Sequence, residues 1–207
     1  MRWGFRPLRV LATSDLHRAV AWLRRALAYA EEQGLDTVVC CGDFQSVEAI
    51  KVLAGFKGRA FAVPGNMDGP EVAEALEEAG VSLHGKAVEH GGFVFAGAGA
   101  LGFRDALASL GASLPSSPSR LVLVTHHPPK GLKVDLALNL MHVGSGTLRS
   151  FIEARRPLAC ICGHIHEARG VDWLGDTLVV NPGPLAKGYA AIVDLARGRA
   201  DLVSLEL

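Results

Sequence analysis

Short apolar runs recur along this chain, and each is followed by a few polar residues. Runs of this kind that end at turn-forming residues are typical of buried strands in an α/β sheet. Each run is four to six residues long and rich in Val, Leu and Ala. Five such strands are predicted at 8–13, 37–41, 60–63, 121–124 and 158–162.

Segments with helical periodicity follow the first three runs. In 19–32, apolar residues recur every three to four positions, and Gly34 then ends the pattern. In 46–55, Ser46 suits the N-cap position, and 70–79 begins with a proline, which suits a first helical turn. Strand-helix-strand units of this kind build parallel sheets.

The pattern changes after Gly80 and again after residue 166, where short runs replace the strand-helix units. These runs predict the other edge of the sheet or a second sheet, with antiparallel strands towards the C-terminus. We therefore predict an α/β fold of two packed mixed sheets flanked by helices, in a single domain that spans 1–207. The later strands are expected at 81–83, 87–89, 93–97, 171–174, 177–180, 189–194 and 200–205.

A polar cluster follows each of the five main strands. Because strands that end at one edge of an open sheet bring their loops around a common crevice, the clusters are expected to converge. Carboxylate, amide and imidazole groups suit Mn, Fe, Co or Zn, and there are enough of them for two ions, which implies phosphate chemistry. The clusters are Asp15-Leu16-His17, Gly42-Asp43, Gly65-Asn66, Thr125-His126-His127-Pro128 and Gly163-His164-Ile165-His166.

The order of these clusters resembles that of the calcineurin-like metallophosphoesterases over about 9–184, including bacterial and archaeal phosphodiesterase-like members. The resemblance implies a four-layer αββα sandwich and two divalent metal ions, with a hydroxide held between the ions as the nucleophile. Asp43 would bridge the ions. The implied ligands are Asp15, His17 and His166 for one ion, and Asn66, His126 and His164 for the other.

One departure from the family pattern concerns leaving-group protonation. Most members have a histidine after Gly-Asn, whereas this chain has Met67, which cannot donate a proton. Two histidines are candidates for the missing role, namely His127 beside a predicted ligand and His142 in a loop before a helix-like segment at 146–154. Alternatively, Ser145 in that loop only caps the helix. Asp68, next to the departure, is predicted as a helix N-cap.

A smaller departure is Ser46, where many relatives carry Asp or Asn, at a position that is not a direct ligand. His84 and His90 lie near predicted turns with no cluster around them, so both are predicted to be surface residues. The segment Asn181-Pro182-Gly183-Pro184 resembles the loop that follows the motif strands in phosphodiesterase-like members, and we expect it to have a structural role.

Composition sets limits on partners and location. Lys plus Arg equals Asp plus Glu at 21 each, so long nucleic acid is not favoured as a partner. Apolar residues make up 49% of the 207 residues, yet no run reaches the roughly 18 that a membrane span needs. Residues 1–7 lack the features of a signal peptide. We expect a cytoplasmic protein with no membrane partner and a small phosphoester substrate, and its oligomeric state is left open.

Four cysteines precede two of the polar clusters. Cys40, Cys41, Cys160 and Cys162 are predicted to be small buried strand residues. Their spacing is not that of a structural zinc knuckle, and a disulfide between neighbouring strands is expected only in a thermophile.

The segment Gly97-x-Gly99-x-x-Gly102 resembles a dinucleotide-binding fingerprint, but it lacks the acidic residue about 20 positions later. We interpret it as a tight glycine turn near the site. This weakens the hypothesis of a dinucleotide-dependent enzyme.

The function that fits these features best is a phosphodiesterase that acts on small nucleotide-like substrates. A phosphomonoesterase, including a protein phosphatase-like enzyme, is the close alternative. It would need assisted departure of an alkoxide, which Met67 makes harder. A third alternative is an inactive metal-binding scaffold of the same fold. It predicts that some of the ligand residues are replaced, and none of the seven is replaced here.

Overall fold

The computed structural model describes residues 8–115 and 120–207. The expectation about residues 1–7 lies outside the described residues. Among the helices of the described part, none has the length and hydrophobicity that crossing a membrane requires.

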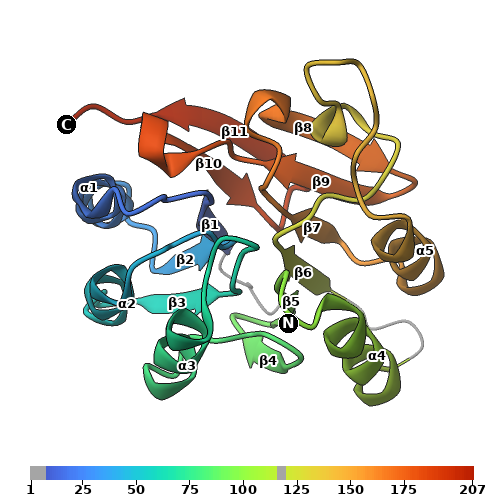
Figure 1. The fold of residues 1–207 in the computed structure, drawn as a ribbon, viewed down its shortest axis with the longest axis horizontal. Helices are drawn as coiled ribbons and strands as arrows, with labels where there is room; N and C mark the ends of the chain where they lie inside the picture. The colour runs from blue at the N-terminus through green and yellow to red at the C-terminus, as the bar shows by residue number, and fades with distance from the viewer. Residues whose placement is uncertain (1–7, 116–119) are drawn as a thin grey trace, which may run out of the picture.

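Two mixed sheets form the centre of the molecule (Figure 1). One has the strand order β11-β10-β1-β2-β3, and the other has the order β4-β5-β6-β7-β9-β8. Parallel pairing joins β1 to β2 to β3 and β5 to β6 to β7 to β9, while β10, β11, β4 and β8 pair antiparallel. The strands are β1 Arg9–Thr13, β2 Thr37–Cys40, β3 Arg59–Ala62, β4 Ala87–His90, β5 Phe93–Ala98, β6 Leu121–Thr125, β7 Ala159–Ile161, β8 Gly170–Leu174, β9 Thr177–Asn181, β10 Tyr189–Asp194 and β11 Arg199–Ser204.

Helices cover the outer faces of both sheets, which confirms the predicted four-layer αββα sandwich. Three of them pack on the first sheet and two on the second (Figure 1). Short 3₁₀ turns lie in the connections after β6, β7 and β9. The helices are α1 Val20–Glu32, α2 Val47–Ala54, α3 Pro70–Glu78, α4 Phe103–Ser113 and α5 Gly146–Arg155, and the 3₁₀ turns are η1 Lys133–Asp135, η2 His166–Ala168 and η3 Leu185–Lys187.

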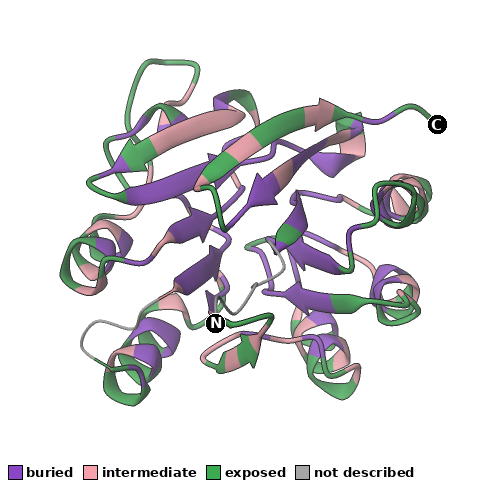
Figure 2. Cartoon of the chain, turned by 180° about the vertical axis from the view of Figure 1, so that it is seen from behind, coloured by how far each residue is buried: buried purple, intermediate pink, exposed green. Residues whose placement is uncertain are grey.

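The layer between the two sheets is a continuous apolar core. Phe61 on β3 stacks on Phe95 on β5, with ring centroids 4.7 Å apart, and both side chains are fully buried. Figure 2 shows that the central strands are buried along their length, whereas the helices expose their outer faces. Because both faces of each central strand are covered, these strands have nearly continuous apolar sequences.

Local signals place two of the helices as predicted. Ser46 accepts a hydrogen bond from Ala49 N at 3.3 Å and caps α2. Ser145 accepts one from Leu148 N at 3.1 Å and caps α5. The predicted cap at Asp68 is wrong, because the N-cap of α3 is Gly69, and no side chain of the described residues caps this helix.

Two expectations between α3 and β5 are also wrong. The run at 81–83 is not a strand, and its backbone makes only an isolated bridge, between Ser82 and Ala62. His84 and His90 are half-buried and bonded: Gly99 N donates to His84 Nδ1 at 3.0 Å, and Thr37 Oγ1 lies 2.9 Å from His90 Nε2.

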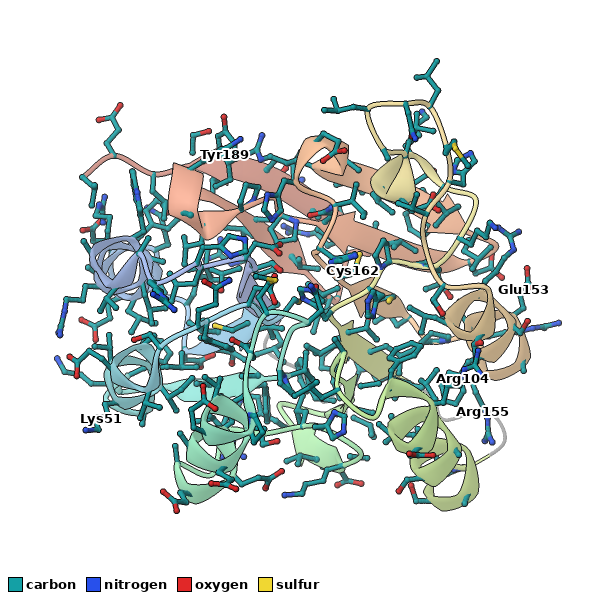
Figure 3. The ribbon with its side chains drawn as sticks, in the orientation of Figure 1. Lys51, Arg104, Glu153, Arg155, Cys162 and Tyr189 are labelled. Atoms are coloured by element: carbon teal, nitrogen blue, oxygen red, sulfur yellow. The ribbon has the colours of Figure 1, made fainter. Side chains whose placement is uncertain are left out.

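All four cysteines are free and buried, as predicted. Burial raises the pKa of Cys40 and of Cys160 to about 12, so these thiols stay protonated. Figure 3 labels Cys162 near the middle of the molecule, where β7 ends.

Gly97 is predicted to be essential for close packing between β5 and its neighbours. A Cβ at this position would lie 2.5 Å from Leu83 Cβ and 2.7 Å from Val63 Cγ1. Overpacking of this kind costs about 1–3 kcal/mol, so Gly97→Ala should lower the free energy of unfolding by that amount in urea denaturation. In Gly146→Ala, the control, the new Cβ meets nothing within 4 Å and stability should not fall. Equal stability of the two variants would contradict this account of the packing.

Candidate metal centre

The first group of candidate ligands combines the loop after β1 with the bend after β7. Asp15, His17 and His166 offer a carboxylate oxygen and two ring nitrogens that lie within 4.8 Å of one another. His17 Nε2 is 3.0 Å from His166 Nε2, which in turn is 3.3 Å from Asp15 Oδ1. Two ligands held about 2.1 Å from one ion at roughly right angles are about 3 Å apart, so these distances fit a shared cation.

The second group comes from the loops after β2, β3 and β6. Asp43 and His126 also form a triad with Asp15, and His126 Nε2 lies 2.7 Å from Asn66 Oδ1 and 3.7 Å from Asp43 Oδ1. His126 Nδ1 is 2.7 Å from the carbonyl oxygen of Cys41, so the ring proton is on Nδ1 and Nε2 presents a lone pair. Lone pairs that face one another repel unless a cation lies among them.

His164 connects the two groups. Its backbone N–H donates to Asp15 Oδ2 at 3.0 Å, and its ring centroid is 4.9 Å from that of His126. The predicted bend after β7 is therefore present, and both histidines of this segment reach the cluster. The structure brings together all seven predicted ligands, and this donor set fits Mn, Fe, Co or Zn. The seven are Asp15, His17, Asp43, Asn66, His126, His164 and His166.

The backbone is left-handed at four of these residues. The φ angles are 54° at Asp15, 47° at His17, 58° at Asp43 and 71° at His164. This conformation costs non-glycine residues about 1–2 kcal/mol each, and such strain is concentrated at functional sites. Each left-handed residue turns the chain sharply just after a strand, which directs the neighbouring side chains into the cluster.

Glycine at position 65 lets two ligand loops approach each other. A Cβ on Gly65 would collide with the carboxylate and the backbone nitrogen of Asp43. The next loop residues complete the contact, because Met67 N donates to Asp43 Oδ1 at 2.8 Å. The Gly-Asn sequence is therefore a packing requirement, and not only a ligand signature.

Asp68 and Gln45 hold the ligand loops, and sequence reasoning missed both roles. Asp68 is buried, and its carboxylate accepts from Gln45 N at 2.7 Å and from Gly65 N at 2.8 Å. The Gln45 side-chain amide lies 3.1 Å from His17 Nδ1. The nearer Gln45 atom is Nε2. If His17 binds a cation through Nε2, its Nδ1 carries the proton, and a 180° turn of the Gln45 amide group would present the oxygen Oε1 as the acceptor. The single sequence gives no signal for this contact beyond the position of Gln45 two residues after Asp43.

The loop at 181–184 supports the site from behind. Asn181 Nδ2 donates to the carbonyl oxygen of Ile165 at 2.8 Å, and Gly183 N donates back to Asn181 Oδ1 at 2.9 Å. Pro184 forms a bridge beside Ser14, which precedes the first ligand. These contacts give the loop the structural role that was predicted for it.

His127 packs against the cluster without belonging to either ligand triad. Its ring centroid is 4.7 Å from that of His164 and 5.6 Å from that of Phe103. Burial, together with the neighbouring His126 and His164, lowers the pKa of His127 to about 4, so the ring is neutral near pH 7. A neutral imidazole offers one N–H donor and one acceptor nitrogen to a substrate.

The pKa values of three residues in the cluster are shifted, in different directions and for different reasons. Burial raises the pKa of Asp15, but interactions with its neighbours, the hydrogen bond from His166 foremost, more than offset this and leave the pKa below its usual value. The bond to Asp15 raises the pKa of His166. Burial lowers the pKa of His164.

His142 lies in a loop pinned by Asp135. The two side chains meet at 2.7 Å between Nδ1 and Oδ1, and Asp135 also accepts from the backbone of Gly131, Leu132 and Gly144. Within the described part of the chain, no hydrogen bond, ion pair or ring contact joins His142 to the seven ligands. Its predicted catalytic role therefore stays a prediction.

Known proteins share this fold and sequence pattern. The chain is 28% identical over 198 residues to an uncharacterised protein of Methanocaldococcus jannaschii, covering 86% of this chain and 88% of the relative. Its fold is similar to that of an archaeal phosphodiesterase, with a TM-score of 0.64, 22% identity and coverage of 95% and 99% of the two chains. It is also similar to a dimetal phosphatase from Danio rerio, with a TM-score of 0.68, 12% identity and coverage of 97% and 96%.

The sequence itself matches a family model over most of its length. The model of the calcineurin-like phosphoesterase superfamily domain covers residues 8–196, which include every candidate ligand described above. Members of this family are generally metal-dependent hydrolases, in agreement with the donor cluster at the strand ends. The chain therefore belongs to the calcineurin-like phosphoesterase superfamily.

Proposed function

We propose that this protein is a phosphodiesterase that uses two divalent metal ions and acts on small nucleotide-like phosphodiesters. The observation that supports the proposal is the convergence of the donor residues: five form two triads that share Asp15, and Asn66 and His164 contact members of these triads. In this assignment, which follows the family pattern, Asp43 would contribute to both ions. The overall charge of zero favours small substrates over long polyanions.

Each part of the site has a distinct role in this proposal. Two bound divalent ions supply a water nucleophile of lowered pKa and neutralise charge on the phosphoryl oxygens. Asp43 would hold the two ions close together, and Asn66 would bind one of them. His127 donates its N–H to a phosphoryl or leaving-group oxygen, a role its packing beside His164 supports. Gln45 and Asp68 keep His17 and the loop at Gly65 in position.

Met67 sets a limit on the substrates. The methionine is 58% exposed and offers no proton, so a leaving group must depart without an acid at this position. A positioned general acid typically contributes 10²–10⁴-fold. This favours phosphoesters with stable leaving groups, such as aryl esters, over esters that must release an alkoxide.

Asp43→Asn tests the proposed bridge. The wild-type protein loaded with Mn²⁺ should bind about two ions per chain and hydrolyse bis(4-nitrophenyl) phosphate. Asp43→Asn should hold one ion or fewer and lose turnover, because the bridge loses the negative charge that keeps two cations together. Asp176→Asn, in an exposed turn, is the matched control. Elemental analysis and initial rates measure both effects, and an Asp43→Asn variant with two ions and normal rates would refute the assignment.

Gln45→Leu tests the hydrogen bond behind His17. Loss of a residue that orients a metal-binding histidine typically weakens metal affinity about 10–100-fold. We expect that loss in a Mn²⁺ titration of Gln45→Leu, and recovery of most of the affinity in Gln45→Glu, which keeps an acceptor oxygen. Gln33→Leu, at the exposed end of α1, should bind metal like the wild type. Unchanged affinity in Gln45→Leu would show that the contact has no role in metal binding.

Met67→His tests the missing acid. The new imidazole should raise kcat/KM for alkyl esters more than for aryl esters, by up to about 10²-fold, because only poor leaving groups need a proton. Met141→His places a histidine at a similarly exposed position in another loop and should have no such effect. Absence of a selective gain would mean that His127, His142 or a metal-bound water already assists the leaving group.

A further inference from the structure

A cavity beside the metal centre is not used by the mechanism described so far. It lies between α3 and the segment 99–102 and has a volume of about 440 Å³, within the range of small-molecule sites. Its apolar walls come from Pro64, Ala73 and Leu101. Ligand sites are typically apolar clefts with a few well-placed polar groups, and this cavity also has such groups.

The cavity shares a wall with a metal-ligand loop. Pro64 lines the cavity and directly precedes Gly65 and Asn66. The carbonyl oxygen of Pro64 accepts from Ala100 N at 2.8 Å, which ties the Asn66 loop to the segment that carries Leu101. The cavity wall at Pro64 is therefore two residues from Asn66, which we assign to the metal centre.

The side chain of His84, which lines the cavity, offers a hydrogen-bond donor. Gly99 N donates to His84 Nδ1 at 3.0 Å, so the acceptor side of the ring is occupied. Burial lowers the pKa of His84, which keeps the imidazole neutral near pH 7. The proton of the neutral ring is then on Nε2, and this atom is a hydrogen-bond donor.

Three glutamate carboxylates in the cavity wall provide hydrogen-bond acceptors, which complement the donor of His84. Glu74, Glu77 and Glu78 all line the cavity, and Glu77 forms an ion pair with Lys86. Within the described part of the chain, no ion pair involves Glu74 or Glu78. Their charge repels phosphate and attracts amino groups, so it favours a substrate that enters with its phosphate towards the metal centre.

We propose that this cavity binds the nucleobase of the substrate, with a preference for bases that carry an amino group. The inference rests on the proposed function, since it identifies the substituent next to the scissile phosphate. The apolar walls at Pro64, Ala73 and Leu101 cover the faces of a flat ring. His84 donates to a ring nitrogen or carbonyl, and the carboxylates of Glu74 and Glu78 accept from the exocyclic amine.

Binding of uncharged nucleosides to the full chain tests the cavity separately from catalysis. Isothermal titration should show binding of adenosine and cytidine, and weaker binding of uridine, which has no amino group. Ala73→Phe fills the cavity and should weaken all three by roughly tenfold or more. The double variant Glu74→Gln/Glu78→Gln should lose roughly tenfold for adenosine and cytidine but little for uridine, because it removes charged acceptors.

Glu71→Gln is the matched control, because Glu71 is exposed on the same helix and does not line the cavity. It should bind nucleosides like the wild type. If Ala73→Phe fails to fold, as judged by circular dichroism, the double variant still decides. The proposal is overturned if no nucleoside binds, if uridine binds as well as adenosine, or if the cavity variants bind like the wild type.

Hydrolysis of bis(4-nitrophenyl) phosphate by the wild type separates this proposal from the proposed function, because that diester has no nucleobase. Hydrolysis without nucleoside binding would overturn the cavity proposal and leave the phosphodiesterase proposal standing. Nucleoside binding that the cavity variants lose, without hydrolysis, would support the cavity and contradict the phosphodiesterase.

Discussion

The burial of two carboxylates beside four imidazoles is the constraint on which the rest of this structure depends. Asp15 and Asp43 are 1% and 3% exposed, and buried charges are costly unless opposite charge or hydrogen bonds compensate them. Backbone donors at His164 and Met67 satisfy some of their lone pairs. The remaining lone pairs face those of neighbouring imidazoles such as His126. Divalent cations resolve this repulsion, which is why we place them at the centre of the function.

The sandwich holds the backbone of these ligand loops in strained conformations. Parallel strands of both sheets end at the same edge, and the strained residues follow them directly, as at Asp15 and Asp43. Strain of about 1–3 kcal/mol per residue persists only where the surroundings over-determine the backbone. Here a rigid apolar core fixes the strand ends, and Asp68 joins the loops after β2 and β3 with two hydrogen bonds.

Much of the fold was predictable because its signals are local. Apolar runs located the main strands, and serines at 46 and 145 marked two helix starts. The order of the polar clusters predicted seven candidate ligands, and the structure brings these residues together. The roles of Asp68 and Gln45 were not predictable, because they depend on contacts between loops. The run at 81–83 was misread because a run as short as Val81-Ser82-Leu83 does not distinguish a strand from a buried connection. The cavity at α3 has no signature in the sequence.

Anomalous diffraction from crystals grown with Mn²⁺ tests the central claim most directly. The account predicts two anomalous peaks about 3.5–4 Å apart, as in other two-metal sites, with the Asp43 carboxylate between them. One peak should lie among Asp15, His17 and His166, and the other among Asn66, His126 and His164. A single peak, or peaks that Asp43 does not contact, would contradict the dinuclear centre.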